Sequence, residues 1–193
     1  MFNRKVCNTL FALVFTSTLL HAVSSNAQAP GVGELPALTV LVRHAERASA
    51  PADDPPLTQD GTKRAQALAA TLRDTKFSAI VTTHLIRTRD TAQPTATALG
   101  LALDPVDVKG MNPDAHAKAI VGVVRKHAGA AVLVVNHSNT LRHIIAALGG
   151  PQFPNICESV YDHLFALVPI SGKMQLISSR YGAVSPPPEP GCM

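Results

Sequence analysis

The sequence lacks the motifs that identify several large classes of enzyme. It contains no His-Glu-x-x-His motif, no clustered pair of cysteines and no glycine-rich phosphate-binding loop. Its histidines do not have the spacing of a metal-ligand set. These absences argue against a zinc protease, a cysteine-ligated metal site and a P-loop enzyme. They favour a reaction that requires neither a metal nor another cofactor.

A long apolar run occurs at the N-terminus. Residues 6–23 are almost uncharged, follow Arg4 and Lys5, and precede small residues up to Ala27. This order is typical of a secretory signal peptide. A membrane anchor is the alternative, but the run is marginally short for a spanning helix and contains several polar residues. We therefore expect residues 1–27 to be cleaved, the protein to be periplasmic or secreted, and no stable membrane insertion after cleavage.

Charged residues are few, and their signs nearly balance. The full chain has 17 basic and 13 acidic residues, so loss of Arg4 and Lys5 with the signal peptide would leave 15 basic and 13 acidic, a net charge of +2. A balance this small does not predict binding to nucleic acid or to a membrane surface. The cationic side chains must therefore be considered one by one.

Cysteines are also scarce, and only Cys157 and Cys192 lie beyond the predicted cleavage site. An oxidising compartment permits one disulfide between them. The bridge would join the proline-rich C-terminal tail to the body of the domain. Two unrelated thiols are the alternative, because the spacing alone does not exclude them.

Two apolar runs each lead to a histidine. One covers residues 39–42 and precedes Arg43 and His44, and the other covers residues 131–135 and ends two residues before His137. Apolar runs of this length predict buried strands. Open α/β sheets bind their ligands at the carboxyl ends of such strands. If the two strands are parallel neighbours, the two histidines face each other across one crevice.

Strand and helix patterns alternate along the rest of the chain, which predicts an α/β sheet with helices on both faces. There is no internal repeat and no interior linker. We expect a loose segment at residues 28–36, one domain at 37–182 and a proline-rich tail at 183–193 that is either disordered or draped on the surface. The expected strands are residues 38–42, 77–81, 101–106 and 131–135, followed by a hairpin of 163–170 and 173–179. Four helices are expected. The first follows an N-cap at Thr58, the second begins at about Arg87 and is kinked at Pro94, the third has its N-cap at Asp114, and the fourth begins at Thr140.

Three polar stretches occur in a defined order, at residues 43–46, 85–92 and 135–140, with Leu57-Thr58…Gly61…Arg64-Ala65 between the first two. Their order and setting resemble the motifs of the histidine phosphatase superfamily, which has a phosphoglycerate mutase-like fold. The stretches are similar to that family's Arg-His-Gly, Ser-x-x-x-Arg-x-x-x-Thr-Ala and Ser-His-Gly motifs. The resemblance covers about residues 38–150 and implies a three-layer α/β/α domain with a mostly parallel sheet.

The resemblance implies a phosphomonoester hydrolase that is independent of metals. His44 would be the nucleophile and would form a phosphohistidine, while Arg43, Arg87 and His137 would form the phosphate pocket. Arginine suits this task because its guanidinium gives paired N–H donors to phosphate oxygens. A neutral imidazole nitrogen can attack phosphorus, and a histidine donor stabilises the charge of the transferring phosphoryl group.

Three further residues are candidates for substrate binding. Arg47 lies near the position of a second arginine in the related acid phosphatases. Ser138 and Asn139 precede a predicted helix, whose first backbone N–H groups could bind an anion.

The proton donor is not evident from the sequence. Hydrolysis needs an acid for the leaving oxygen, and many family members have a glutamate where this chain has none, within residues 101–115. The candidates for the proton donor are Asp107, with Asp104 and Asp114 in the same region of the sequence, and Glu46. Asp107 is favoured among them.

The expected substrate is a small-molecule or glycan phosphomonoester, because an exported protein does not meet glycolytic intermediates or cytoplasmic phosphoproteins. Two alternatives remain open. A non-catalytic phosphate-binding module is supported by the missing glutamate, although a pure binding site has no use for a nucleophile at His44. The second alternative is a phosphotransferase, which would pass the phosphoryl group to an alcohol acceptor.

Overall fold

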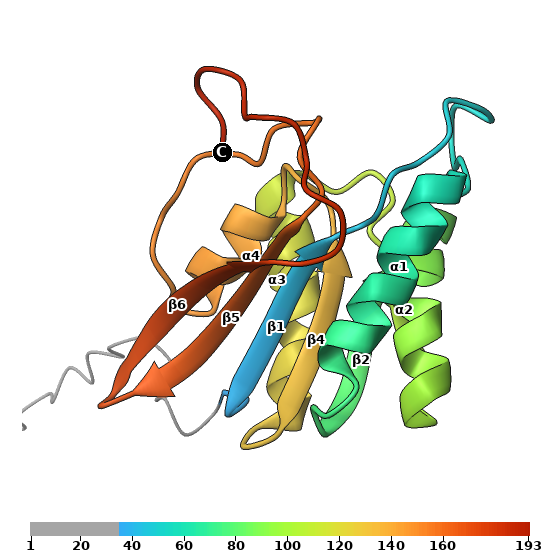
Figure 1. Cartoon of the computed structure of the whole chain (residues 1–193). Helices are drawn as coiled ribbons and strands as arrows, with labels where there is room; N and C mark the ends of the chain where they lie inside the picture. Colours follow the sequence, from blue (N-terminus) through green and yellow to red (C-terminus); the bar gives the residue numbers. More distant parts are fainter. Residues whose placement is uncertain (1–34) are drawn as a thin grey trace, which may run out of the picture.

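One six-stranded sheet separates two layers of helices (Figure 1). The computed structural model describes residues 35–193, so the predicted signal peptide and most of the segment 28–36 lie outside the described residues. The strands are β1 (Leu38–Arg43), β2 (Phe77–Thr83), β3 (Leu103–Val106), β4 (Ala131–Asn136), β5 (His163–Ile170) and β6 (Lys173–Arg180); the helices are α1 (Gln59–Leu72), α2 (Ile86–Leu99), α3 (Pro113–Val124) and α4 (Leu141–Ala147).

The sheet has the order β3-β2-β4-β1-β5-β6 and is mostly parallel, as predicted. The pairs β1–β4, β2–β4 and β2–β3 are parallel, while β5 is antiparallel to both β1 and β6. The expected hairpin of β5 and β6 turns at Ser171 and Gly172, both of which have positive φ. Because β1 and β4 are parallel neighbours, the polar residues that follow them emerge side by side.

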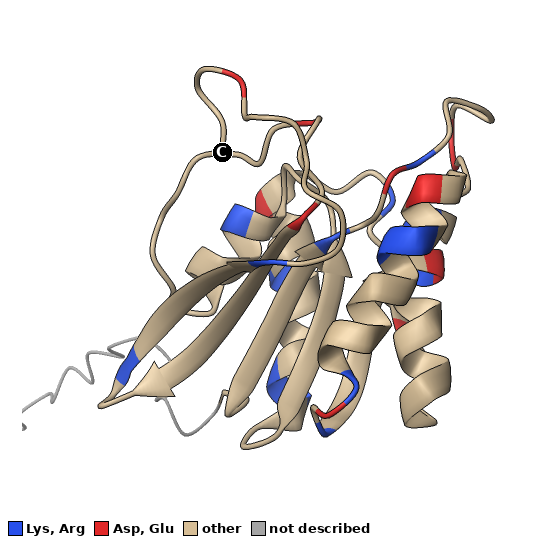
Figure 2. Cartoon of the chain, viewed as in Figure 1, with Lys and Arg blue, Asp and Glu red and all other residues tan. Residues whose placement is uncertain are grey.

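The core lies on both faces of the sheet. Leu41 packs in the cluster under α3 and α4, whereas Val40 and Val42 pack in the cluster under α1 and α2. Burial of each such side chain contributes about 1.5–3 kcal/mol. The interiors of β1, β2 and β4 contain no charged residue, and many charged residues gather on loops and helix ends around the carboxyl ends of the parallel strands (Figure 2).

Helix α1 begins at its predicted N-cap and holds the segment that follows β1. The Thr58 hydroxyl accepts a hydrogen bond from the Gly61 N–H, and the Thr58 N–H donates to the Glu46 carbonyl. A Cβ on Gly61 would lie 2.1 Å from that same carbonyl oxygen, so this position requires glycine. This close contact fixes the chain just after His44.

The predicted N-cap of α3 is wrong by two residues. The cap is Asn112, whose side chain accepts from the Ala115 N–H, and Pro113 begins the helix. Asp114 lies in the first turn, where its carboxylate faces the positive end of the helix dipole and pairs with His143 at 2.7 Å. Aspartate is favoured at both positions, which explains the error.

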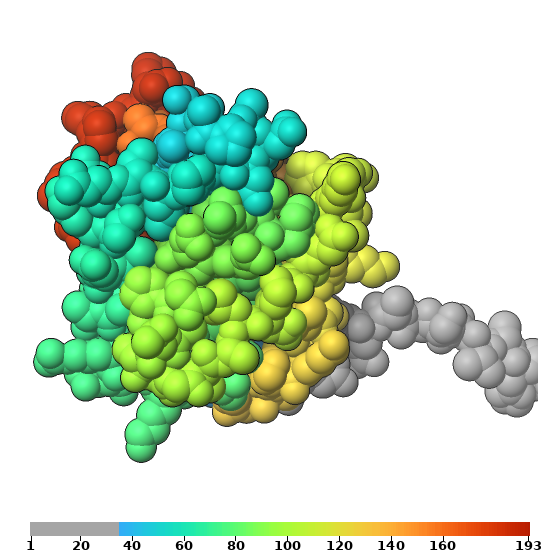
Figure 3. Space-filling model, turned by 90° about the vertical axis from the view of Figure 1, so that its right-hand side faces the viewer, coloured from blue at the N-terminus to red at the C-terminus, as the bar shows by residue number. Residues whose placement is uncertain are grey.

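The C-terminal tail is draped on the domain, which was one of the two predicted alternatives. The Met193 N–H donates to the Asn155 carbonyl, and the Cys157 N–H donates to the Met193 carbonyl. The expected disulfide between Cys157 and Cys192 is present, with a Cα–Cα distance of 5.1 Å. The tail and the segment after β1 lie at the same end of the molecule, as the red and cyan surfaces show (Figure 3).

Within residues 35–193, no helix combines the length and the apolar character needed to cross a membrane.

Candidate active site

A polar pocket of about 570 Å³ lies at the carboxyl ends of the parallel strands. It is reached by segments that follow β1, β2, β3 and β4, as the rule for ligand sites in open α/β sheets predicts. Its lining includes the side chains His44, Arg47, Asp53, His84, Arg87, Lys109, His116, His137, Ser138, Asn139 and Glu158.

His44 follows directly on β1 and is almost completely buried. Its Nδ1 lies 2.8 Å from the Ala45 carbonyl oxygen. Because a carbonyl can only accept, Nδ1 carries the proton and Nε2 has a free electron pair. The pKa of His44 is lowered to about 3, mainly by burial and further by the charges of Arg43 and Arg87. The imidazole is therefore neutral at ordinary pH, as a nucleophile must be.

His137 follows β4 and lies opposite His44, as the strand pairing predicted. The two ring centroids are 5.4 Å apart with an interplanar angle of 63°. His137 Nε2 contacts the Thr83 hydroxyl at 3.3 Å, and Nδ1 has no partner among residues 35–193. Burial holds the pKa of His137 well below its usual value, so this ring is also neutral and has one N–H to donate.

Arg43 is fully buried, and its guanidinium is largely engaged by the protein. Nη1 donates to the backbone carbonyls of Cys157, Glu158 and Val160 at 2.9–3.0 Å, and Nη2 donates to the Glu158 carboxylate at 2.7 Å. The Tyr161 ring lies 4.0 Å from the guanidinium carbon. Of the guanidinium nitrogens, only Nε lacks a partner within residues 35–193. The structure therefore differs from the expectation of a guanidinium that turns a free pair of donors to phosphate.

Arg87 lies in the first turn of α2 and is oriented by an aspartate from the loop after β1. The Asp54 carboxylate accepts from the Ile86 N–H at 2.9 and 3.0 Å, and it lies 3.6 Å from Arg87 Nη1. Arg87 Nε is buried without a partner among the described residues. The Asp54 carboxylate thus caps the N-terminus of α2 and also orients the Arg87 guanidinium, because the backbone N–H and the guanidinium both bind a negatively charged acceptor.

The predicted substrate-binding residues line the same pocket. Arg47 is exposed and has no ion pair within residues 35–193, so its charge is available to a ligand. Asn139 is exposed, while Ser138 is buried and donates its hydroxyl to the Glu158 carboxylate.

The candidates for the proton donor do not line the pocket. Glu46 binds Arg64 through both carboxylate oxygens, and Asp107 is mostly exposed and lies 3.2 Å from His84 Nδ1. The carboxylates that do line it belong to Asp53 and Glu158. Glu46 and Asp107 therefore have other partners in this structure.

Five of these lining side chains were not identified from the sequence, namely Asp53, His84, Lys109, His116 and Glu158. Glu158 lies in an irregular segment, and its only sequence signal is its position next to Cys157. His84 belongs to the predicted turn before α2, and His116 lies on the buried face of α3, where its Nε2 has no hydrogen-bond partner among the described residues. The His116 ring centroid is 5.8 Å from that of His137.

Within the part of the chain that the structure describes, no three His, Cys, Asp or Glu side chains are arranged to hold a metal ion.

A sequence model of the histidine phosphatase superfamily (branch 1) matches residues 39–109. This span contains Arg43, His44 and Arg87 and ends before His137. No curated protein matches the sequence closely enough to serve as a relative.

Several solved structures have the same fold. YhfR of Bacillus stearothermophilus is 18% identical, with a TM-score of 0.55 over 71% of this chain and 93% of that chain. The protein histidine phosphatase SixA, complexed with tungstate, is 16% identical, with a TM-score of 0.58 over 74% and 96%. A mycobacterial glucosyl-3-phosphoglycerate phosphatase is 15% identical, with a TM-score of 0.57 over 76% and 98%. This likeness confirms the predicted phosphoglycerate mutase-like fold.

Proposed function

We propose that this chain, a member of the histidine phosphatase superfamily, is an exported phosphomonoester hydrolase that works through a phosphohistidine on His44 and needs no metal. The observation that carries the proposal is the hydrogen bond from His44 Nδ1 to the Ala45 carbonyl. It leaves Nε2 of a buried, neutral imidazole as a nucleophile beside His137 and two arginines.

The binding step is supported by buried nitrogens that lack protein partners. Nε of Arg43, Nε of Arg87 and Nδ1 of His137 are each buried without an acceptor among residues 35–193. A buried donor without an acceptor costs about 1–3 kcal/mol. The oxygens of a phosphoryl group would satisfy such donors, and the arginine charges would offset those of the dianion.

In the reaction we propose, His44 Nε2 attacks phosphorus and the bond from phosphorus to the leaving oxygen breaks. The leaving oxygen takes up a proton, and phosphohistidine remains on His44. Water then attacks the phosphohistidine, which releases inorganic phosphate and restores the neutral imidazole. His137 and Arg87 would stabilise the charge of the transferring group in both steps.

We propose a small-molecule or glycan phosphomonoester as the substrate, in the periplasm or outside the cell. The pocket is polar, and Arg47 at its rim offers a second cationic contact beyond the phosphate site. Export is supported by the apolar N-terminal run and by the disulfide, because disulfides persist in oxidising compartments.

A non-catalytic phosphate-binding module is the second candidate. It is favoured by one observation: the predicted proton donors have other partners and do not line the pocket. A phosphotransferase is distinguished from a hydrolase by its products when an alcohol acceptor is added.

The test is hydrolysis of p-nitrophenyl phosphate by the purified protein and by His44→Ala, both with chelator, from acidic to neutral pH. We expect activity that resists the chelator and is lost by at least about 10³-fold in the variant. Activity that survives in His44→Ala would refute the nucleophile. Phosphate binding without turnover in the wild type would favour the binding module.

A further inference from the structure

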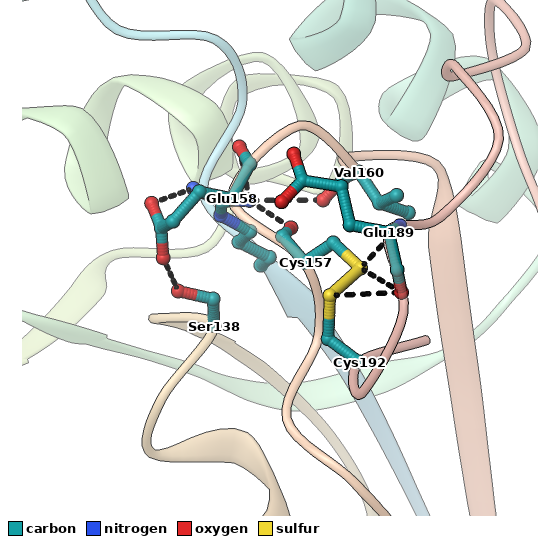
Figure 4. The surroundings of a disulfide bond; sticks show 7 residues. Ser138, Cys157, Glu158, Val160, Glu189 and Cys192 are labelled. Atoms are coloured by element: carbon teal, nitrogen blue, oxygen red, sulfur yellow. Dashed lines mark hydrogen bonds and ion pairs between the residues drawn. A yellow bond between two sulfur atoms is a disulfide. The ribbon is translucent and has the colours of Figure 1, made fainter.

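The carboxylate of Glu158 spans the two strand ends that form the candidate phosphate site. Its Oε2 accepts from Arg43 Nη2 at 2.7 Å, next to β1. Its Oε1 accepts from the Ser138 hydroxyl, which follows β4 (Figure 4). Both carboxylate oxygens therefore accept hydrogen bonds, which is the pattern of an ionised carboxylate.

The donors that Glu158 binds are of the kind that bind phosphate. An arginine and a hydroxyl offer N–H and O–H groups to an oxyanion, and a carboxylate can accept from them as a phosphate oxygen does. Glu158 also lines the same pocket as His44, Arg87 and His137. The Glu158 carboxylate, an anion of the protein itself, thus binds donors on Arg43 and Ser138 close to the proposed nucleophile.

We propose that Glu158 is a built-in competitor of phosphate: its carboxylate occupies Arg43 and Ser138 when the site is free, lowers the affinity for inorganic phosphate and so accelerates product release. This inference rests on the proposed function, because it takes the pocket to be a phosphate site. It makes Glu158 a determinant of affinity rather than the proton donor.

The backbone of Glu158 is held in place while its side chain can move. The carbonyls of Cys157, Glu158 and Val160 all accept from Arg43 Nη1, and Cys157 is cross-linked to Cys192 in the tail (Figure 4). The Glu158 side chain is nevertheless 73% exposed. It can therefore leave Arg43 when a phosphate binds and return when the phosphate departs.

The charge of Glu158 is the basis of the competition. A phosphate dianion in the pocket would lie close to an ionised carboxylate, and two like charges repel each other. Arg47, Arg87 and Lys109 supply the positive charge of the pocket, which Glu158 and Asp53 oppose. Removal of one of these two negative charges should therefore tighten phosphate binding.

The experiment measures inorganic phosphate binding by calorimetry and phosphate inhibition of p-nitrophenyl phosphate hydrolysis. The variants are Glu158→Gln, which removes the charge but retains the shape, and Glu158→Ala, which removes the group. Glu189→Gln is the matched control, because Glu189 lies on the same disulfide-linked surface and its carboxylate makes no hydrogen bond or ion pair with another described residue. Circular dichroism establishes that each variant is folded.

We expect both Glu158 variants to bind phosphate at least about tenfold more tightly, and to have a correspondingly lower inhibition constant and KM. Glu189→Gln should match the wild type. Unchanged or weaker phosphate binding in both Glu158 variants would overturn the inference, and so would a fall in kcat at unchanged phosphate affinity, which is the result for a proton donor.

The proposed function is tested separately by the wild type and His44→Ala. If the wild type hydrolyses the substrate and His44→Ala does not, then unchanged phosphate binding in the Glu158 variants refutes only the inference. If no protein in the series binds phosphate, both proposals fail.

Discussion

Residues 38–150 and residues 151–193 build the pocket by different means. In the first region, strand ends and helix starts present His44, Arg87 and His137, and every one of them belongs to a sequence motif. In the second region, an irregular segment that is cross-linked to the tail presents Glu158 and three carbonyls to Arg43, and no motif marks them. In the proposed reaction the first region supplies the reacting and phosphate-binding groups, and the second pairs one of them, Arg43, with a carboxylate.

The motif to which a residue belongs does not determine its hydrogen-bond partners. Arg43 belongs to the first motif, yet its terminal nitrogens donate to residues of the second region. Arg87 belongs to the second motif and is directed by Asp54 at a longer distance, 3.6 Å. We therefore expect Arg87 to be the more available of the two arginines for a phosphate.

Arg87→Ala tests whether the first region carries the chemistry. We expect kcat/KM for p-nitrophenyl phosphate to fall about 10²–10³-fold, because a charged donor to the transferring phosphoryl group is lost. Asp54→Asn should cause a smaller loss, since it weakens the orientation of Arg87 but keeps an acceptor for the Ile86 N–H.

Arg89→Ala is the matched control for that experiment. Arg89 lies on the same helix, is exposed and does not line the pocket. Its removal should leave kcat/KM within about twofold of the wild type. Equal losses for Arg87→Ala and Arg89→Ala would contradict the assignment of Arg87.

Loss of the disulfide tests whether the second region is held by its cross-link. Cys157 and Cys192 are 35 residues apart, and a closed loop of this length stabilises a fold by about 4 kcal/mol. Cys157→Ser/Cys192→Ser should therefore lower the free energy of unfolding by about this amount in urea titrations. Reduction of the wild-type protein should give the same loss, and a stability unchanged by both treatments would contradict the prediction.

The pH dependence of stability tests the buried histidine of the first region. His44 has a pKa of about 3 in the folded protein, and a free histidine has a pKa of about 6.5. Between these values the unfolded chain binds the proton and the folded chain does not, so stability is complete above about pH 6.5 and falls as the pH drops towards 3. Burial lowers the pKa of His137 and of His116 as well, which adds to the loss.

His44→Gln cannot titrate at this position and should reduce that dependence. The slope of the free energy of unfolding against pH should fall by up to about 1.4 kcal/mol per pH unit below pH 6. Urea titrations of the wild type and the variant at several pH values measure the slope. Parallel curves for the two proteins would show that His44 is charged in the folded state.

Much of the architecture follows from short-range patterns. The apolar runs before His44 and His137 predicted β1 and β4, Thr58 predicted the start of α1, and Ser171-Gly172 predicted the last turn. Each of these depends on the 2.0- or 3.6-residue period, a cap or a turn residue within a few positions. The error at Asp114 is of the same scale, because an aspartate also suits the first turn of a helix.

The sequence predicted the two histidines of the candidate site but not the hydrogen bonds that surround the site. His44 and His137 were paired from the sequence because parallel neighbours in a sheet end together. The position of Glu158 followed from no local rule, since it depends on the path of an irregular segment and on a tail that is cross-linked to it.

Local patterns in this chain were sufficient for its strands, most helix boundaries and its α/β class, because these depend on residues close together in the sequence. The facing of His44 and His137 depended in addition on the parallel pairing of β1 with β4. The partners of Arg43 depend on residues 114 to 117 positions away, which only the folded chain brings together. Tertiary packing therefore decided which carbonyls and which carboxylate surround Arg43, because buried donors must find acceptors wherever the fold supplies them.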